Sequence, residues 1–197
     1  MTAMIESIAA RPMHTMHTIR RLISADHRSG PRAGTSYALA DGPVEKVLRD
    51  PARPGFTSTR IWVTDATPAA IHRLDVIERI PDALEPPRGG SVFRLYTIPP
   101  DAGWINSITR EKVGAYFATA GSPQASRYSA NAPHPYMQQT RTLDLCVVLE
   151  GEITLVLDKE QAKLSTGDTV VQRGTSHAWS NRTDHLCVIA VSSHDAS

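Results

Sequence analysis

The stretch "TLDLCVVLEGEITLVLD", residues 142–158, contains two apolar runs separated by Glu-Gly-Glu. Both runs have the length and the aliphatic composition of buried strands, and the glycine permits a tight turn between them. In the first run Asp144 alternates with leucines and is followed at the same spacing by Cys146 and Val148. Such alternate side chains share one face of a strand. The stretch therefore predicts two strands, the first with a carboxylate on an otherwise apolar face.

The remainder of the last third has the same character. The segments "QAKLSTGD" (161–168), "TVVQRG" (169–174), "SHAWSN" (176–181) and "HLCVIAVSS" (185–193) are short strand-like runs separated by turn residues. Earlier strands are predicted at residues 57–65 and 91–100, and one helix at 107–121, capped by Ser107 and ended by Gly121. Many short strands with tight turns favour an all-β antiparallel barrel with a few short helices.

Length and composition limit the class of protein. A chain of 197 residues with 41% hydrophobic residues is long enough for one domain, and we expect a flexible leader at residues 1–18 followed by a single domain at 19–197. The formal charge of +1 gives no reason to expect nucleic acid or an anionic membrane as a partner. No apolar stretch approaches the roughly 20 residues of a membrane span. A cytoplasmic location is therefore expected, with Cys146 and Cys187 as buried free thiols.

Two motifs resemble the signatures of the cupin superfamily. The first is "QQTRTLDLCVVLEGEI" (138–153) and the second is "GDTVVQRGTSHAWSN" (167–181). The matching positions are Asp144 and Gly151 in the first motif, and Gly167, Asp168, Gly174, His177 and Asn181 in the second. The resemblance is concentrated in residues 133–192 and is similar to small single-barrel cupins. It implies a jelly-roll barrel, also called a double-stranded β-helix, with a site inside it and a homodimeric assembly.

The metal-binding part of the resemblance is altered. Cupins with an intact site supply histidines where this chain has Gln138 and Thr140, and a proline where it has Gln172. If a divalent metal (Zn, Fe, Mn or Ni) binds, the resemblance implies that His177, Asp144 and Gln138 hold it. His134 would add a second imidazole only if its loop reached the site. We therefore expect a degenerate metal site, because amide and hydroxyl oxygens are weak ligands for these metals.

The same resemblance places the candidate site residues. His177 and Asp144 are the candidate catalytic residues. The candidate pocket residues are Gln138, Thr140, Thr142, Cys146, Trp179, Arg94 and Tyr96. A structural role for Asp144, paired with His177 or an inward arginine, is an alternative, because a buried carboxylate needs a partner. Asn181 is expected to hold a loop backbone.

Three functions remain open from the sequence. The first is a cupin-type enzyme (a decarboxylase, dioxygenase, isomerase or dehydratase) acting on a small organic acid or an aromatic or polyketide-like metabolite. The second is a non-catalytic barrel that binds a small molecule through neutral hydrogen bonds. The third is a barrel kept for oligomerisation. The fold alone does not separate them, because one fold supports many functions.

Overall fold

The computed structural model describes residues 18–73 and 76–197, and the described part of the chain is built mainly from antiparallel strands. The prediction of an all-β barrel with a few short helices is confirmed. The predicted leader lies outside the described residues apart from Thr18. No helix among the described residues is long and apolar enough to cross a membrane.

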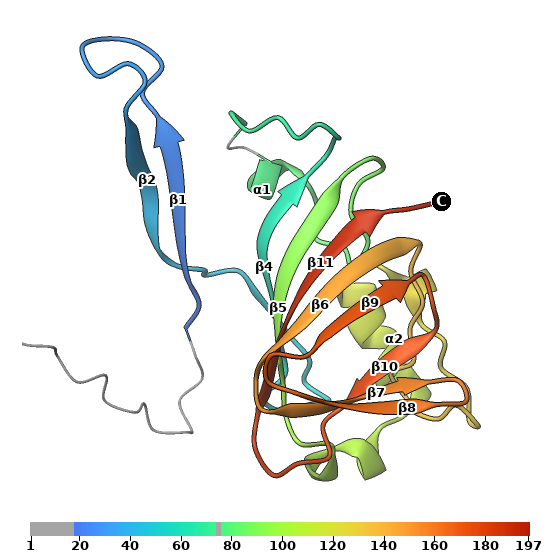
Figure 1. The fold of residues 1–197 in the computed structure, drawn as a ribbon. Coiled ribbons are helices and arrows are strands. Elements are labelled where there is room, and N and C mark those ends of the chain that lie inside the picture. Colours follow the sequence, from blue (N-terminus) through green and yellow to red (C-terminus); the bar gives the residue numbers. More distant parts are fainter. Residues whose placement is uncertain (1–17, 74–75) are drawn as a thin grey trace, which may run out of the picture.

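Two sheets form the barrel (Figure 1). The larger sheet has six strands, in the order β3 (Val47–Arg49), β4 (Thr57–Thr64), β5 (Ser91–Ile98), β11 (Cys187–Asp195), β6 (Thr142–Glu150) and β9 (Thr169–Arg173). The smaller sheet has three, in the order β10 (His177–Ser180), β7 (Glu152–Leu157) and β8 (Gln161–Ser165). From β6 onward the chain passes back and forth between the two sheets, which brings residues distant in sequence to one interior.

The turn at Gly151 carries the chain from one sheet to the other. β6 pairs with β9 and β11, whereas β7 pairs with β8 and β10. Gly151 has a φ of +78°, and a Cβ there would lie 2.7 Å from the carbonyl oxygen of Leu186. Only glycine meets both conditions without strain.

The helices are short. They are α1 (Val76–Arg79), α2 (Arg110–Thr119) and the 3₁₀ turns η1 (Asp101–Gly103), η2 (Ile105–Ser107) and η3 (Pro123–Ala125). The prediction that Ser107 caps the long helix is wrong, because η2 ends at Ser107 and extended backbone at Ile108 follows. Thr109 is the cap instead, and its side chain accepts a hydrogen bond from Lys112 N.

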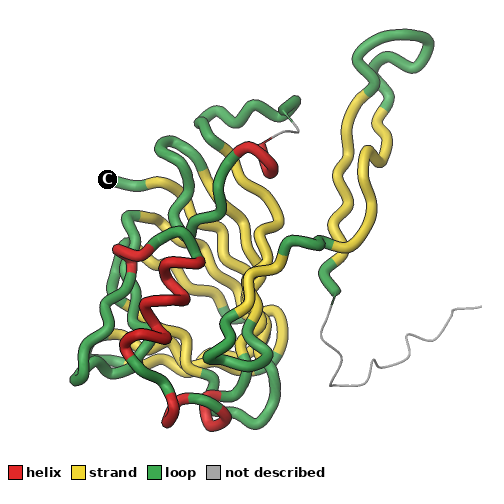
Figure 2. The backbone as a smooth tube through the Cα atoms, turned by 180° about the vertical axis from the view of Figure 1, so that it is seen from behind, coloured by secondary structure: helices red, strands yellow, loops and turns green. Residues whose placement is uncertain are grey.

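The hydrophobic core lies between the sheets and α2. Val113 and Phe117 of α2 are fully buried in the same cluster as Ile98, Val148 and Ile153 from the strands. Figure 2 shows α2 lying across the strands. Both cysteines are free and buried, which confirms that prediction. Polar side chains also face this interior and line the candidate site.

A separate hairpin projects from the barrel (Figure 1). It is formed by β1 (Arg20–Asp26) and β2 (Ser36–Pro43), and most of its residues are exposed. Arg21 connects it to the barrel by donating a hydrogen bond to the carbonyl oxygen of Ile61 at 3.1 Å.

Candidate functional site

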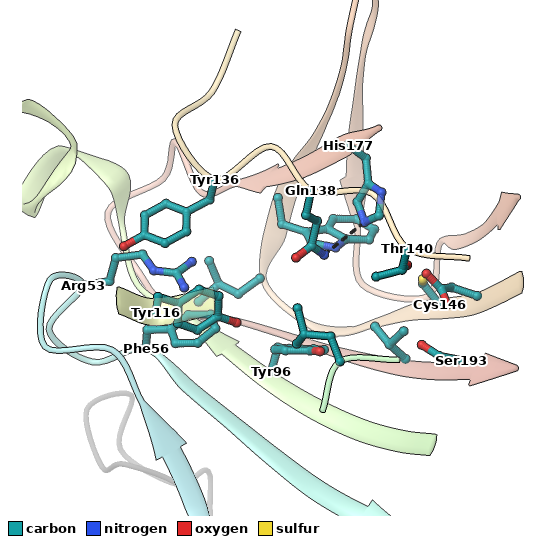
Figure 3. A pocket seen from close by; sticks show the side chains of 15 residues that line it. Arg53, Phe56, Tyr96, Tyr116, Tyr136, Gln138, Thr140, Cys146, His177 and Ser193 are labelled. Atoms are coloured by element: carbon teal, nitrogen blue, oxygen red, sulfur yellow. Dashed lines mark hydrogen bonds between the residues drawn. The ribbon is translucent and has the colours of Figure 1, made fainter. Parts of the chain in front are cut away.

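A small cavity of about 50 Å³ lies inside the barrel (Figure 3). Its lining residues are Arg53, Phe56, Leu84, Tyr96, Ile98, Tyr116, Tyr136, Gln138, Thr140, Asp144, Cys146, His177, Trp179, Val191 and Ser193. The predicted residues His177, Asp144, Gln138, Thr140, Cys146, Trp179 and Tyr96 are therefore brought together, in a largely apolar and aromatic wall.

His177 is held at the start of β10. Its backbone N–H donates to Gln138 O at 2.9 Å, and Gln138 N–H donates back to His177 O at 2.8 Å. The imidazole Nδ1 lies 2.9 Å from the carbonyl oxygen of Thr175. Because a carbonyl only accepts, Nδ1 carries the proton and Nε2 has a free lone pair. Gln138 Nε2, at 3.3 Å, is the donor that meets this lone pair.

The charge state of His177 follows from its surroundings. The residue is 3% exposed. Burial lowers the pKa of His177, which the Thr175 carbonyl and the Asp144 carboxylate only partly offset. At neutral pH the side chain is therefore a neutral imidazole.

Asp144 reaches the same cavity from β6. It is 6% exposed, and its Oδ1 has no hydrogen-bond partner among the described residues. Among the described residues, neither His177 nor an arginine donates a hydrogen bond to Asp144. The pairing of Asp144 with one of these side chains, considered from the sequence, is therefore not present. An unpaired buried carboxylate is energetically costly. The cavity thus has an unmet acceptor.

Cys146 lies two residues further along the same strand. Burial, reinforced by the Asp144 charge, raises the pKa of the Cys146 thiol to about 12. Thiolates are the reactive form of cysteine. Cys146 is therefore a neutral wall residue at ordinary pH.

Gln138, Thr140 and Thr142 precede Asp144 at every second position, but they do not all lie on one strand. β6 begins at Thr142, so Gln138 and Thr140 belong to the extended segment before it. Thr142 is buried but absent from the cavity lining; its hydroxyl lies 2.7 Å from that of Thr140. Thr142 therefore does not line the cavity as predicted, and instead contacts Thr140, which does.

Arg94 does not face the cavity, although Tyr96 two residues later does. The Arg94 guanidinium donates to the Asp82 carboxylate and to the Ala83 carbonyl oxygen, and lies 3.5 Å from the Ser58 hydroxyl. The pocket role predicted for Arg94 is therefore replaced by a structural one. Burial raises the pKa of Tyr96 well above its ordinary value, which keeps its hydroxyl protonated.

Arg53 is the charged cavity residue that the sequence did not reveal. Its guanidinium carbon lies 3.7 Å from the ring centroid of Phe56 and 3.6 Å from that of Tyr136. Its Nε donates to Asp50 Oδ2 at 2.8 Å, and the Tyr136 hydroxyl donates to the same oxygen at 2.6 Å. Figure 3 shows Arg53 beside Tyr136, across the cavity from His177. The segment "DPARPGF" has no periodicity or motif that would mark this arginine as inward.

His134 lies elsewhere. Its Nδ1 accepts a hydrogen bond from Tyr136 N at 3.1 Å, and its Nε2 lies 3.6 Å from Asp101 Oδ2. It contacts the Trp104 ring edge-on and is not part of the cavity lining. The second imidazole that a metal site would need is therefore not supplied by His134.

The donors present do not fit a tightly held divalent metal. Catalytic zinc or iron sites take three protein ligands, chiefly imidazole, carboxylate or thiolate groups. Within residues 18–73 and 76–197 there is no group of three His, Cys, Asp or Glu side chains that could hold a metal ion. Of the predicted ligands, His177 and Asp144 qualify by type, and Gln138 offers only a neutral amide.

Comparison with known proteins agrees with the sequence motifs. Residues 128–192 match the family model of the Cupin_2 cupin domain. Phomopsin biosynthesis cluster protein C' of Diaporthe leptostromiformis is 53% identical over 47 residues, which is 23% of this chain and 25% of that protein. Oryzines biosynthesis cluster protein J of Aspergillus oryzae is 44% identical over 48 residues, or 24% and 27% of the two chains. The matched segment thus spans about a quarter of each relative.

Among solved structures, the cupin domain of Schizosaccharomyces pombe Cnp3 aligns with 90% of this chain and 89% of its own, at 8% identity and a TM-score of 0.44. The family match at residues 128–192 contains β6 to β10 and the cavity residues Asp144 and His177. Residues 128–192 therefore match the Cupin_2 domain of the cupin superfamily.

Proposed function

We propose that this cupin is a small-molecule enzyme whose chemistry is proton transfer, as in isomerisation or dehydration, with His177 as the general base. The single observation that carries the proposal is the orientation of the buried imidazole. Thr175 O fixes the tautomer, so that the basic Nε2 is the nitrogen available to a ligand on the Gln138 side. A base must be neutral and within hydrogen-bond reach of the proton it removes.

The proton-transfer step uses residues of this chain alone. His177 Nε2 takes a proton from a carbon or hydroxyl of the substrate, and the imidazolium that forms still donates through Nδ1 to Thr175 O. The Asp144 carboxylate favours this cation electrostatically. In an isomerisation the same proton returns to another substrate atom. In a dehydration it leaves with the departing hydroxyl as water.

The wall of the cavity suits this role. Phe56, Tyr96, Tyr116 and Trp179 limit the access of water, which strengthens electrostatic interactions within the site. The Thr140 hydroxyl, positioned by Thr142, is a donor or acceptor that orients the substrate. The donor set gives no basis for a metal-dependent step such as dioxygenation. Two matching relatives, named as members of biosynthesis clusters, are in keeping with small-molecule metabolism.

A non-catalytic binding barrel is the alternative. It is favoured by the 3.3 Å contact between Gln138 Nε2 and His177 Nε2, because this amide occupies the lone pair that the base needs. In an enzyme, the substrate must displace the Gln138 side chain. In a binding protein, the contact persists when the ligand is bound.

Deuterium exchange separates the two functions. The full chain is incubated in D₂O with a panel of small hydroxy, keto and unsaturated acids, and solvent deuterium in each compound is followed by NMR. An enzyme exchanges at least one compound catalytically, and His177→Gln abolishes that exchange while Gln138→Ala retains it. Saturable binding of a panel compound without exchange of any compound would favour the binding barrel.

A further inference from the structure

Two buried polar atoms of the cavity lack a hydrogen-bond partner within the described part of the chain. They are Arg53 Nη2, a donor, and Asp144 Oδ1, an acceptor. Each residue is 6% exposed and lines the cavity. Buried polar groups are almost always paired, so an unmet donor and an unmet acceptor in one cavity indicate what a ligand must supply. The missing groups are one acceptor and one donor.

The Arg53 end is preorganised. The guanidinium lies between the rings of Phe56 and Tyr136, which fixes its plane. Asp50 occupies only Nε, so it leaves the Nη2 edge free. The natural partner of a fixed guanidinium edge is a carboxylate, which matches its geometry and charge.

The charges of the site restrict the rest of the ligand. Asp50 pairs with Arg53 at Nε and leaves Nη2 as the position for one carboxylate, whereas Asp144 has no cation bonded to it among the described residues. A second negative group on the ligand would therefore face Asp144 without compensation. A hydroxyl or ammonium group would instead donate to Asp144 Oδ1. A dianion is excluded on this ground.

We infer that the cavity binds a small monocarboxylic acid that also bears a hydroxyl or ammonium group, with the carboxylate on Arg53 and the donor group on Asp144. This inference rests on the proposed function, since it names the substrate class of the same site. It assigns Arg53, which lies outside the matched segment 128–192, as the residue that selects acids.

Three matched probes test each end of the ligand separately: 3-hydroxybutyrate, butyrate and 3-hydroxybutyramide. Their dissociation constants are measured by calorimetry with the full chain at fixed ionic strength. We expect 3-hydroxybutyrate to bind most tightly, and removal of either end to weaken binding about tenfold, which is the typical effect of one hydrogen bond to a charged group.

Variants assign each end to its residue. Arg53→Met keeps an unbranched apolar stem between the two rings and should remove the preference for acid over amide while keeping the preference for the hydroxyl. Asp144→Leu should remove the preference for the hydroxyl while keeping the preference for acid over amide. Arg49→Met, an exposed arginine close in sequence, is the matched control and should change neither preference. If Arg53→Met does not fold, Arg53→Lys, which keeps the charge without the planar fork, takes its place.

The affinities of the wild-type protein for the probes are sufficient to test the inference. Equal affinity for the three probes, or no saturable binding of any, overturns it, and so does tighter binding of succinate than of 3-hydroxybutyrate. Binding needs no turnover, so the outcome is independent of the deuterium-exchange result. If the probes bind with the expected order and no exchange occurs in any panel compound, only the proposed enzyme activity is overturned.

Discussion

Replacing Asp144 by asparagine should make the protein more stable and less active. The side chain is 6% exposed, and Oδ1 has no partner among the described residues, so the folded state contains a carboxylate that water solvates in the unfolded chain. An unsatisfied buried polar group costs about 1–3 kcal/mol, and more when it is charged. Asparagine keeps the shape and removes the charge, so we expect the free energy of unfolding to rise by about 1 kcal/mol or more at neutral pH.

Urea denaturation followed by circular dichroism measures this change, with two carboxylates as references. Asp158 is exposed, and Asp158→Asn should change the free energy of unfolding by less than about 0.5 kcal/mol. Asp50 accepts hydrogen bonds from Arg53 and Tyr136, so Asp50→Asn should destabilise the fold by about 3–5 kcal/mol, as when a buried ion pair is broken.

A loss of 1 kcal/mol or more in Asp144→Asn would refute the reasoning. It would show that the carboxylate has a stabilising partner in solution. A bound metal ion is one such partner, and metal analysis of the purified wild-type protein and the variant would identify it.

Three further outcomes are expected. Because burial lowers the pKa of His177 below 6.5, base-dependent exchange should continue below pH 6.5 and fall only at the lowered pKa. Between these two values the unfolded chain binds more protons than the folded chain, so urea titrations should show the free energy of unfolding decreasing as the pH is lowered. Gly151→Ala should cost about 1–3 kcal/mol, because alanine strains the positive φ and meets the Leu186 carbonyl, and a wild-type urea midpoint would contradict this. Leu145 and Val171 are cross-strand neighbours exposed on the outer face of the larger sheet, so we predict that two copies of the chain form a homodimer through this face. The double variant Leu145→Lys with Val171→Lys should then be a folded monomer by light scattering. A monomeric wild-type protein would contradict this prediction.

The sequence was sufficient for the features that depend on strand alternation and on the two motifs. The alternate positions Asp144 and Cys146 face the interior because the period of a strand fixes the face of each side chain. The motif containing His177 and Asn181 was equally informative: Asn181 donates to the carbonyl oxygens of Ile98 and His185, which confirms its predicted role in holding backbone.

Strand alternation was not sufficient to predict the contacts of a long side chain that can reach more than one partner. Arg94 and Tyr96 share a face of β5, but the Arg94 guanidinium reaches Asp82 and Ala83 instead of the cavity. Those partners lie in a segment without a regular pattern, so their position is set by tertiary packing alone. Arg53 was missed for the same reason, because an irregular loop gives no period from which to infer which side chains point inward.

The position of Arg53 in the chain bears on how far the relatives inform substrate choice. Arg53 and His177 are 124 positions apart (177 − 53). A match of 47 or 48 residues is too short to contain both, and the Cupin_2 match at residues 128–192 contains only His177. The base and the predicted anchor for the carboxylate therefore come from parts of the chain that can differ independently between relatives. A relative that shares the His177 segment but has no arginine facing the cavity should bind 3-hydroxybutyrate and 3-hydroxybutyramide equally, whereas one with such an arginine should prefer the acid about tenfold.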